Sequence, residues 1–240
     1  MKKAIILFAI VLSTSTFTFS QVFTSFSVKG SLIETLLKNS AGKIETIVDE
    51  TVDIKNVEFK YKLNAGTTMS DSTPVSKDFT KPQNINLSNP NEGNKTWQVI
   101  VNQLKTATLP FSLSFSKSNP LDVNTPNPKG WSGYGIDYKR TDALYFGDEG
   151  VSFYITFNTG AKELSYNLAV LAPDAIAGEF AVECSADFKK WSTLASYNSA
   201  NSMIKNNVYT HALKSDVKFV RWVYYTRVKQ NVTLNNINVK

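Results

Sequence analysis

The stretch that decides the fold is KFVRWVYYTRVKQNVTLNNINV, residues 218–239. Side chains alternate in its first half, so Val220, Trp222 and Tyr224 share one face of an extended strand. The opposite face carries a more polar set, made up of Phe219, Arg221, Val223, Tyr225 and Arg227. We therefore expect two arginines and a tyrosine to project from the same side of a sheet.

The second half, residues 231–239, predicts another strand. Its apolar residues are Val232, Leu234, Ile237 and Val239. The alternation slips at Asn235-Asn236, as it does at a β-bulge. We predict that the two strands pair as the closing hairpin of a β-sandwich.

The first twenty residues, 1–20, have the layout of a secretory signal peptide. Two lysines precede an apolar run from Ala4 to Leu12, and Thr18 and Ser20 offer the small side chains that a signal peptidase requires. Cleavage before Gln21 predicts a secreted, periplasmic or cell-surface protein. About nine apolar residues are too few for a membrane span of about twenty, so we expect no span after cleavage.

The composition excludes several classes of site. The formal net charge of the 240 residues is +6, and no run of lysines and arginines marks a nucleic-acid surface, so we expect no nucleic-acid partner. A single cysteine cannot form a disulfide within the chain. One cysteine and one histidine are also too few to fill a zinc site of the His/Cys kind. Cys184 shares a strand face with Phe180 and Val182, which favours a buried structural thiol.

We predict no catalytic residue and no enzymatic activity. A Ser-His-Asp or Cys-His mechanism would have to use His211, which no nucleophile motif accompanies. A hydrolase with paired carboxylates is kept as an alternative to a binding protein, because the second half of the chain holds several acidic residues. They are Asp137, Asp142, Asp148, Glu149, Glu163 and Glu183, and their spacing selects no pair.

The remaining length fits two small all-β domains, residues 21–105 and 106–240, joined near residues 105–110. Alternation predicts strands in both, and residues 31–39 form either a short helix or a loop. Strands are expected near 57–61, 97–101, 151–158, 163–171 and 208–213, with a hairpin over 179–197 that turns at 187–190. The residues that alternation assigns to the inward faces of the strands at 151–158 and 163–171 are Phe153, Ile155, Phe157, Leu164, Tyr166, Leu168 and Val170.

Residues 23–103 resemble the small immunoglobulin-like or cadherin-like modules at the N-termini of secreted and surface proteins of polysaccharide-using Gram-negative bacteria. The resemblance rests on FSVKG at 26–30, DFTKPQNINL at 78–87 and TWQVIV at 96–101. It implies a spacer or platform without an active site. Asp71-Ser72-Thr73 also resembles the tripeptide used for O-glycosylation in that group.

Residues 106–240 resemble galactose-binding-like jelly-roll domains of bacterial secreted proteins. In those domains an S-x-D-x-x-x-W turn joins two strands and an arginine lies in a later strand; the matching residues are Ser185, Asp187, Trp191 and Arg221. The family's final L-D-D-I is replaced by Asn235 and Asn236. Because amides bind Ca²⁺ more weakly than carboxylates do, this replacement weakens the calcium site that the resemblance implies. A structural calcium ion stays an alternative, and we expect no other metal or cofactor.

Sugar binding is the sharper hypothesis for the second domain, because pyranose rings stack on aromatic side chains and their hydroxyls need charged or planar partners. The candidate ligand residues are Arg221, Tyr225, Arg227, Glu183 and Asn167, which we expect together on one outward sheet face, and Trp131, Tyr134 and Tyr138 in a glycine-rich loop. The alternatives are that Glu183 and Arg221 merely pair across the sheet and that the loop aromatics plug the sandwich. Trp191, which follows the Asp187 turn, is expected in the core and not as a platform for a ligand.

These observations predict a secreted, non-catalytic protein with two β-sandwich domains, immunoglobulin-like and then jelly-roll. Its expected partner is a glycan or cell-surface polysaccharide. The alternative is a surface adhesin or structural module whose partner is another surface protein. An exposed contiguous apolar patch would favour the alternative.

Overall fold

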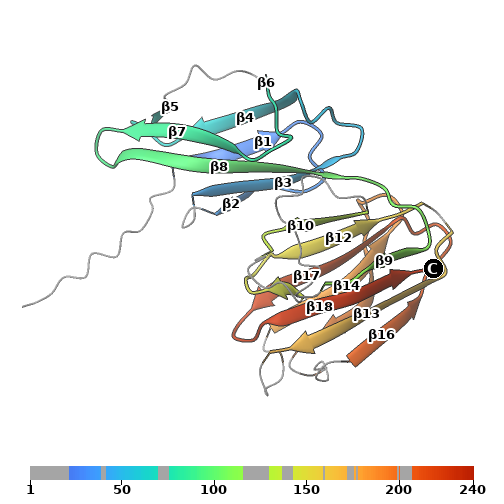
Figure 1. Ribbon diagram of the computed structural model, residues 1–240. Helices are drawn as coiled ribbons and strands as arrows, with labels where there is room; N and C mark the ends of the chain where they lie inside the picture. The colour runs from blue at the N-terminus through green and yellow to red at the C-terminus, as the bar shows by residue number, and fades with distance from the viewer. Residues whose placement is uncertain are drawn as a thin grey trace, which may run out of the picture.

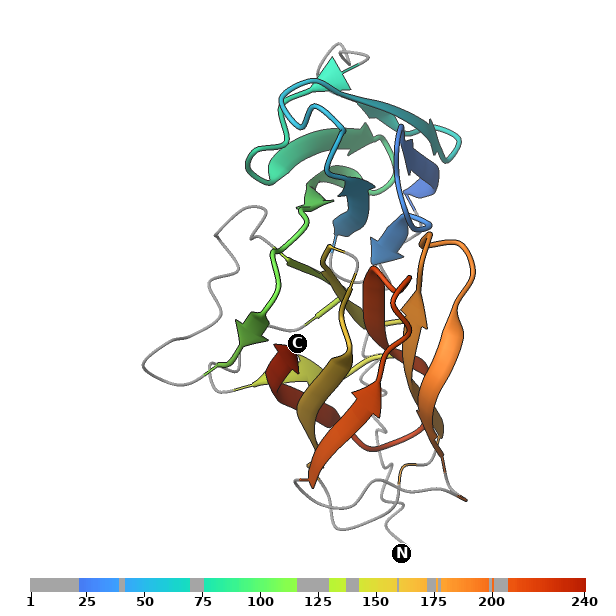
Figure 2. The same ribbon diagram turned by 90° about the vertical axis from the view of Figure 1, so that its right-hand side faces the viewer.

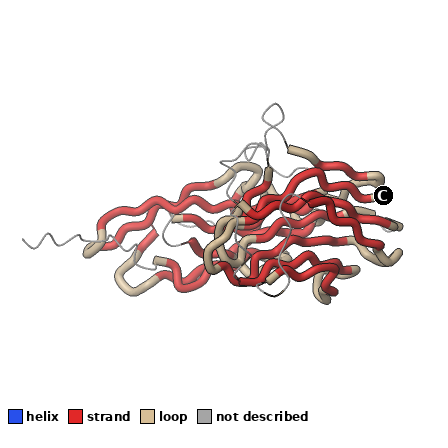
Figure 3. Tube along the Cα trace, turned by 90° about the horizontal axis from the view of Figure 1, so that it is seen from below, coloured by secondary structure: helices blue, strands red, loops and turns tan. Residues whose placement is uncertain are grey.

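The computed structural model describes residues 22–38, 42–69, 76–115, 130–136, 143–158, 160–171, 176, 178–198, 200 and 207–240. All regular elements in these ranges are β-strands, so the all-β prediction is confirmed (Figure 3). The predicted signal peptide, the tripeptide at 71–73 and Tyr138 lie outside these ranges. Within them, the structure has no helix with the length and hydropathy of a transmembrane segment.

The N-terminal unit consists of two sheets. One has the order β1 (Phe23–Val28), β4 (Val57–Leu63), β6 (Ser76–Lys77); the other has the order β2 (Leu36–Lys38), β3 (Lys43–Asp49), β8 (Gly93–Leu104), β7 (Gln83–Asn89), β5 (Thr68–Met69). The β3–β8 pair is parallel, and its other neighbours are antiparallel. The short-helix alternative for residues 31–39 is wrong, because residues 36–38 form β2.

The C-terminal unit also has two sheets facing each other. We call the first the Arg221 sheet: β10 (Trp131–Tyr134), β12 (Ser152–Thr156), β17 (Phe219–Arg227), β14 (Gly178–Ser185), β15 (Ser192–Tyr197). We call the second the Asn167 sheet: β11 (Leu144–Phe146), β18 (Val232–Val239), β13 (Glu163–Val170), β16 (Asn207–Ala212), with β9 (Phe111–Leu113) also paired to β18.

The expected closing hairpin is wrong. β17 pairs with β12 and β14 in one sheet, whereas β18 pairs with β13, β11 and β9 in the other. The chain between them crosses the end of the sandwich. The apolar faces of both strands therefore meet across the core, with Trp222 and Leu234 both fully buried.

The alternation predicted the inward faces correctly. All the assigned inward residues of β12, β13, β14 and β17 belong to one buried cluster, and Cys184 is among them. The slip at Asn235-Asn236 coincides with a register irregularity in the β13–β18 pair, where Asn236 has a φ of 49°. The hairpin turning at 187–190 is present as β14 and β15.

The two units meet at a buried junction, below β3 and β8 in Figure 1. β3 is buried on both faces: Ile44 and Val48 belong to the core of the N-terminal unit, whereas Ile47 belongs to the junction cluster. Leu104 of β8 joins Ile47 there, together with Tyr154 and Phe188 of the C-terminal unit. The N-terminal unit thus covers part of the outer face of the Arg221 sheet (Figures 1 and 2).

Candidate functional site: a charged and aromatic cluster on the Arg221 sheet

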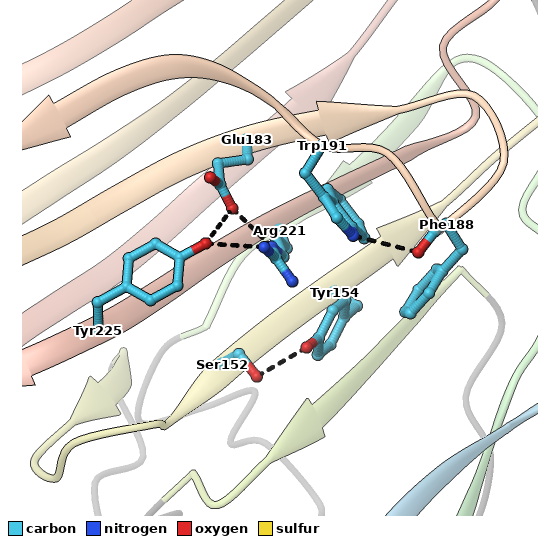
Figure 4. Close-up of polar contacts among 7 residues, drawn as sticks. All are labelled: Ser152, Tyr154, Glu183, Phe188, Trp191, Arg221 and Tyr225. Atoms are coloured by element: carbon cyan, nitrogen blue, oxygen red, sulfur yellow. Dashed lines mark hydrogen bonds and ion pairs between the residues drawn. The ribbon is translucent and has the colours of Figure 1, made fainter. Parts of the chain in front are cut away.

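Glu183, Arg221 and Tyr225 form a hydrogen-bonded cluster on the outer face of the Arg221 sheet (Figure 4). Glu183 and Arg221 are register partners on β14 and β17, which places their side chains side by side. Arg221 Nε donates to Glu183 Oε2 at 2.7 Å, and the Tyr225 hydroxyl donates to the same oxygen at 2.8 Å. Arg221 Nη2 in turn donates to the Tyr225 hydroxyl at 2.8 Å.

Trp191 completes the cluster. The Arg221 guanidinium carbon lies 4.2 Å from the centre of the indole ring, within the range of a cation–π contact. The ring is half-buried and packs against the junction cluster, so Trp191 does not belong to the sandwich core. The preference for a core role was therefore wrong, because the ring follows a turn and strand alternation does not set its direction.

The turn before Trp191 is built by short polar side chains. Ser185 Oγ accepts hydrogen bonds from the backbone N–H groups of Asp187 and Phe188. Asp187 Oδ1 accepts from those of Lys189 and Lys190, both at 2.9 Å. These backbone bonds hold the pKa of the Asp187 carboxyl below its usual value. The turn therefore presents Trp191 at a defined place beside Arg221.

Burial and the charge of Glu183 together set the pKa values of Arg221 and Tyr225 in the cluster. The side chains of Arg221 and Glu183 are 18% and 10% exposed to solvent, and Tyr225 is 38% exposed. Burial alone would lower the pKa of Arg221, but the hydrogen bond and charge of Glu183 outweigh it and raise that pKa. Burial, followed by the bond to Glu183, raises the pKa of Tyr225 to about 12. Near neutral pH Arg221 is therefore a cation and Tyr225 a neutral phenol.

Two other predicted ligand residues on outward faces lie away from the cluster. Asn167 is on β13 of the Asn167 sheet, so grouping it on one face with Arg221 was wrong. Alternation distinguishes inside from outside but says nothing about which sheet a strand joins. Arg227 Nε donates to Asn231 Oδ1 at 3.0 Å, and its Nη2 donates to the Lys229 carbonyl at 3.2 Å. Both hydrogen bonds of Arg227 therefore stabilise the connection between β17 and β18.

The two loop aromatics that the structure describes, Trp131 and Tyr134, point to opposite sides of the Arg221 sheet. Trp131 packs inward, with its ring centre 5.4 Å from that of Phe153, as the plug alternative expected. Tyr134 points outward into the junction, where its hydroxyl donates to the Glu34 carbonyl at 2.8 Å. Burial raises the pKa of Tyr134. Neither ring lies in the charged cluster.

The junction also contains a cleft of about 400 Å³. Asp49 and Glu50 border it from the N-terminal unit, and Lys218 and Phe219 border it from the C-terminal unit. Asp49 accepts hydrogen bonds from the N–H and hydroxyl of Thr51, which stabilise a local turn. Glu50 accepts from the N–H and hydroxyl of Thr106, both at 2.8 Å, and so holds the segment that follows β8. The cleft's acids therefore have a structural role.

Two positions considered for chemistry have structural partners. His211 Nε2 lies 2.8 Å from the Tyr166 hydroxyl, and burial lowers the pKa of His211. Asn235 bonds both the N–H and the carbonyl of Phe115, at 2.8 and 2.9 Å. Over the described ranges, no three His, Cys, Asp or Glu side chains gather as metal ligands would.

Comparisons with known proteins place these features in context. Residues 23–101 match the model of a family described as SGBP, N-terminal. No curated protein matches the sequence. The match lies within the N-terminal unit and ends before the C-terminal unit begins.

Several solved structures are similar in fold. A candidate glycoside hydrolase from Bacteroides thetaiotaomicron has a TM-score of 0.50 at 11% identity, over 90% of this chain and 95% of that one. The K2 adhesin domain of Lys-gingipain has a TM-score of 0.39 at 13% identity, over 55% of this chain and 98% of that one. A family 29 carbohydrate-binding module has a TM-score of 0.37 at 10% identity, over 53% and 88%. At these identities, the first structure indicates a shared fold and nothing about activity.

Proposed function

We propose that this protein is a secreted or cell-surface, non-catalytic binding protein that recognises a glycan. The contact surface is the outer face of the Arg221 sheet, centred on Glu183, Arg221, Tyr225 and Trp191. One observation carries the proposal: a half-buried indole and an exposed phenol flank a guanidinium and a carboxylate on a single sheet face. Aromatic faces suit the C–H faces of sugars, and the charged groups suit their hydroxyls.

The family match supports the same class of ligand. SGBP denotes surface glycan-binding proteins, and the matched residues adjoin the unit that carries the cluster. We propose that residues 21–105 form an immunoglobulin-like module and residues 106–240 a jelly-roll module. The end of β8 at Leu104 and the parallel β3–β8 pair are consistent with this division.

The state of Glu183 supports binding over hydrolysis. Its Oε2 accepts hydrogen bonds from both Arg221 and Tyr225. Glycoside hydrolysis usually requires two carboxyl groups placed on opposite sides of the scissile bond. A carboxylate held by a cation and a phenol is better suited to accepting a hydrogen bond from a sugar hydroxyl than to catalysing hydrolysis.

A glycan-array screen of the full chain, followed by calorimetric titration of the best ligand, tests the proposal. Trp191→Ala and Tyr225→Ala should each weaken binding about tenfold or more, equivalent to about 1.4 kcal/mol. Asn167→Ala is the matched control, because it removes a polar side chain from the opposite sheet. Thermal unfolding of each variant separates lost binding from lost folding.

Two results would overturn the proposal. One is binding that survives Trp191→Ala and Tyr225→Ala but is lost in Asn167→Ala, which would move the site to the other sheet. The other is the absence of any bound glycan across a broad array. Loss of binding in Lys218→Ala as well would extend the contact surface into the junction cleft.

A further inference from the structure

Phe188 has an unusual backbone conformation. Its φ is 64°, in the left-handed region that a bulky side chain rarely adopts. Such a conformation costs free energy and persists only where the surroundings enforce it. The backbone N–H groups of Phe188 and Lys189 donate hydrogen bonds to Ser185 Oγ and Asp187 Oδ1, and these bonds define the turn. They do not explain the position of the Phe188 ring.

The ring of Phe188 is inserted into the junction between the two units. Only 8% of the residue is exposed. The ring stacks on Tyr154 with centres 5.3 Å apart and meets Phe219 edge-to-face at 5.2 Å. Ile47 and Leu104 of the N-terminal unit complete the same buried cluster. Docking of the N-terminal unit therefore helps to hold Phe188 in its strained conformation.

The same residue holds Trp191. The Phe188 carbonyl accepts a hydrogen bond from Trp191 Nε1 at 3.1 Å, and the two rings meet edge-to-face at 5.1 Å (Figure 4). Trp191 then supports the Arg221 guanidinium at 4.2 Å. Ile47 and Leu104 thus share one buried cluster with Phe188, and Phe188 contacts Trp191, which contacts Arg221.

We propose that Phe188 is a positioning residue through which the docked N-terminal unit orients Trp191 for ligand binding. The inference rests on the proposed function, since it assigns Trp191 a ligand contact. It gives the N-terminal unit a role beyond that of a spacer. The glycan site of the C-terminal unit is complete only when the N-terminal unit is docked on it.

The test uses the full chain and two readouts. The first is the dissociation constant for the glycan found by the array. The second, which needs no ligand, is the NMR resonance of the Trp191 indole N–H, identified by its loss in Trp191→Phe. Phe188→Gly removes the ring while accepting the positive φ, so the turn can still form. Phe188→Leu keeps an apolar side chain in the junction.

We expect Phe188→Gly to shift the indole resonance and weaken binding about tenfold, with Phe188→Leu within about threefold of wild type. Leu104→Ala, which changes the junction cluster on the side of the N-terminal unit, should shift the resonance and weaken binding several-fold. Leu87→Ala is its matched control: Leu87 is equally buried, but in the core of the N-terminal unit. It should lower stability and leave the resonance and binding unchanged.

The proposed coupling between the docked N-terminal unit and Trp191 is overturned if Phe188→Gly and Leu104→Ala leave the indole resonance in its wild-type position, whatever glycan is bound. It is also overturned if both variants bind as tightly as wild type while Trp191→Ala does not bind. A shifted resonance in a chain that binds no glycan would support the coupling and refute the proposed function. The two ideas can therefore fail separately.

Discussion

The two outer faces of the C-terminal unit have the same strand alternation but different chemistry. The Arg221 sheet presents an ion pair between largely buried side chains, flanked by aromatic rings, and the N-terminal unit covers part of it. The Asn167 sheet presents a hollow of about 280 Å³ bordered by neutral amides, among them Asn167, Asn235 and Asn236. Its ion pair, between Glu163 and Lys240, is long at 3.6 Å and well exposed.

An outward-pointing residue therefore acquires its role from the groups beside it and from the unit that covers its sheet. A salt bridge between exposed groups contributes little, whereas removing one partner from a buried pair is costly. Glu183 and Glu163 both point away from the core, yet only Glu183 lies in a partly covered site. Four experiments test this difference between the two sheets.

The largest effect is expected where the N-terminal unit covers the Arg221 sheet. Ile47→Asp places a carboxylate in the buried junction and should lower the free energy of unfolding by at least about 3 kcal/mol. Urea denaturation measures it. Ser165→Asp on the Asn167 sheet, at a half-buried position, should cost less than about 1 kcal/mol. Equal losses would mean that the junction is not a stabilising interface.

The two ion pairs should differ next. Glu183→Ala leaves the Arg221 guanidinium without its carboxylate and should cost about 2–3 kcal/mol. Glu163→Ala should cost less than about 0.5 kcal/mol. A double-mutant cycle of Glu183→Ala with Arg221→Ala isolates the pair and should give a coupling of about 1 kcal/mol or more. A coupling near zero would show that the pair is no stronger than a surface contact.

The bulge of the Asn167 sheet should give a smaller effect. Asn235→Ala removes hydrogen bonds to Phe115 and to the Asn236 N–H and should cost about 1–2 kcal/mol. Asn167→Ala, at the rim of the same hollow, should change stability by less than about 0.5 kcal/mol. Thermal unfolding compares them. An Asn235→Ala variant as stable as wild type would contradict a structural role for this side chain.

The smallest effect should come from pH. Burial lowers the pKa of His211 in the folded state, so the unfolded chain binds the proton more readily. The stability due to this group is complete above the unfolded pKa of about 6.5 and is lost as pH falls through the lower folded pKa. His211→Gln should remove this slope from a urea titration series between pH 7 and pH 5. The Arg221 pKa is raised and therefore lies outside this window. An unchanged slope in the variant would assign it to another group.

Much of the fold could be predicted because alternation is a local property. Phe153, Tyr166 and Trp222 were assigned inward from their parity alone, and all three are buried. Strand pairing could not be predicted in the same way. The short connection between β17 and β18 suggested a hairpin, but it joins two sheets, because each strand pairs with segments distant in sequence.

The candidate site was predictable to the same extent. Parity put Glu183, Arg221 and Tyr225 outward, and the structure brings them within hydrogen-bonding distance. Trp191 was misjudged because its direction is set by the Ser185–Asp187 turn and by Phe188. Tyr138 lies outside the described residues, so its part in ligand binding stays a prediction.

The sequence by itself determined the all-β class, the inward face of each long strand and the outward placement of the cluster's charged residues. The physical reason is the two-residue period of an extended chain, which local steric geometry enforces. Only the tertiary structure decided that Asn167 and Arg221 lie on opposite sheets, and that the N-terminal unit holds Phe188 beside Trp191. Those outcomes depend on which distant apolar surfaces bury one another, and no local pattern encodes that choice.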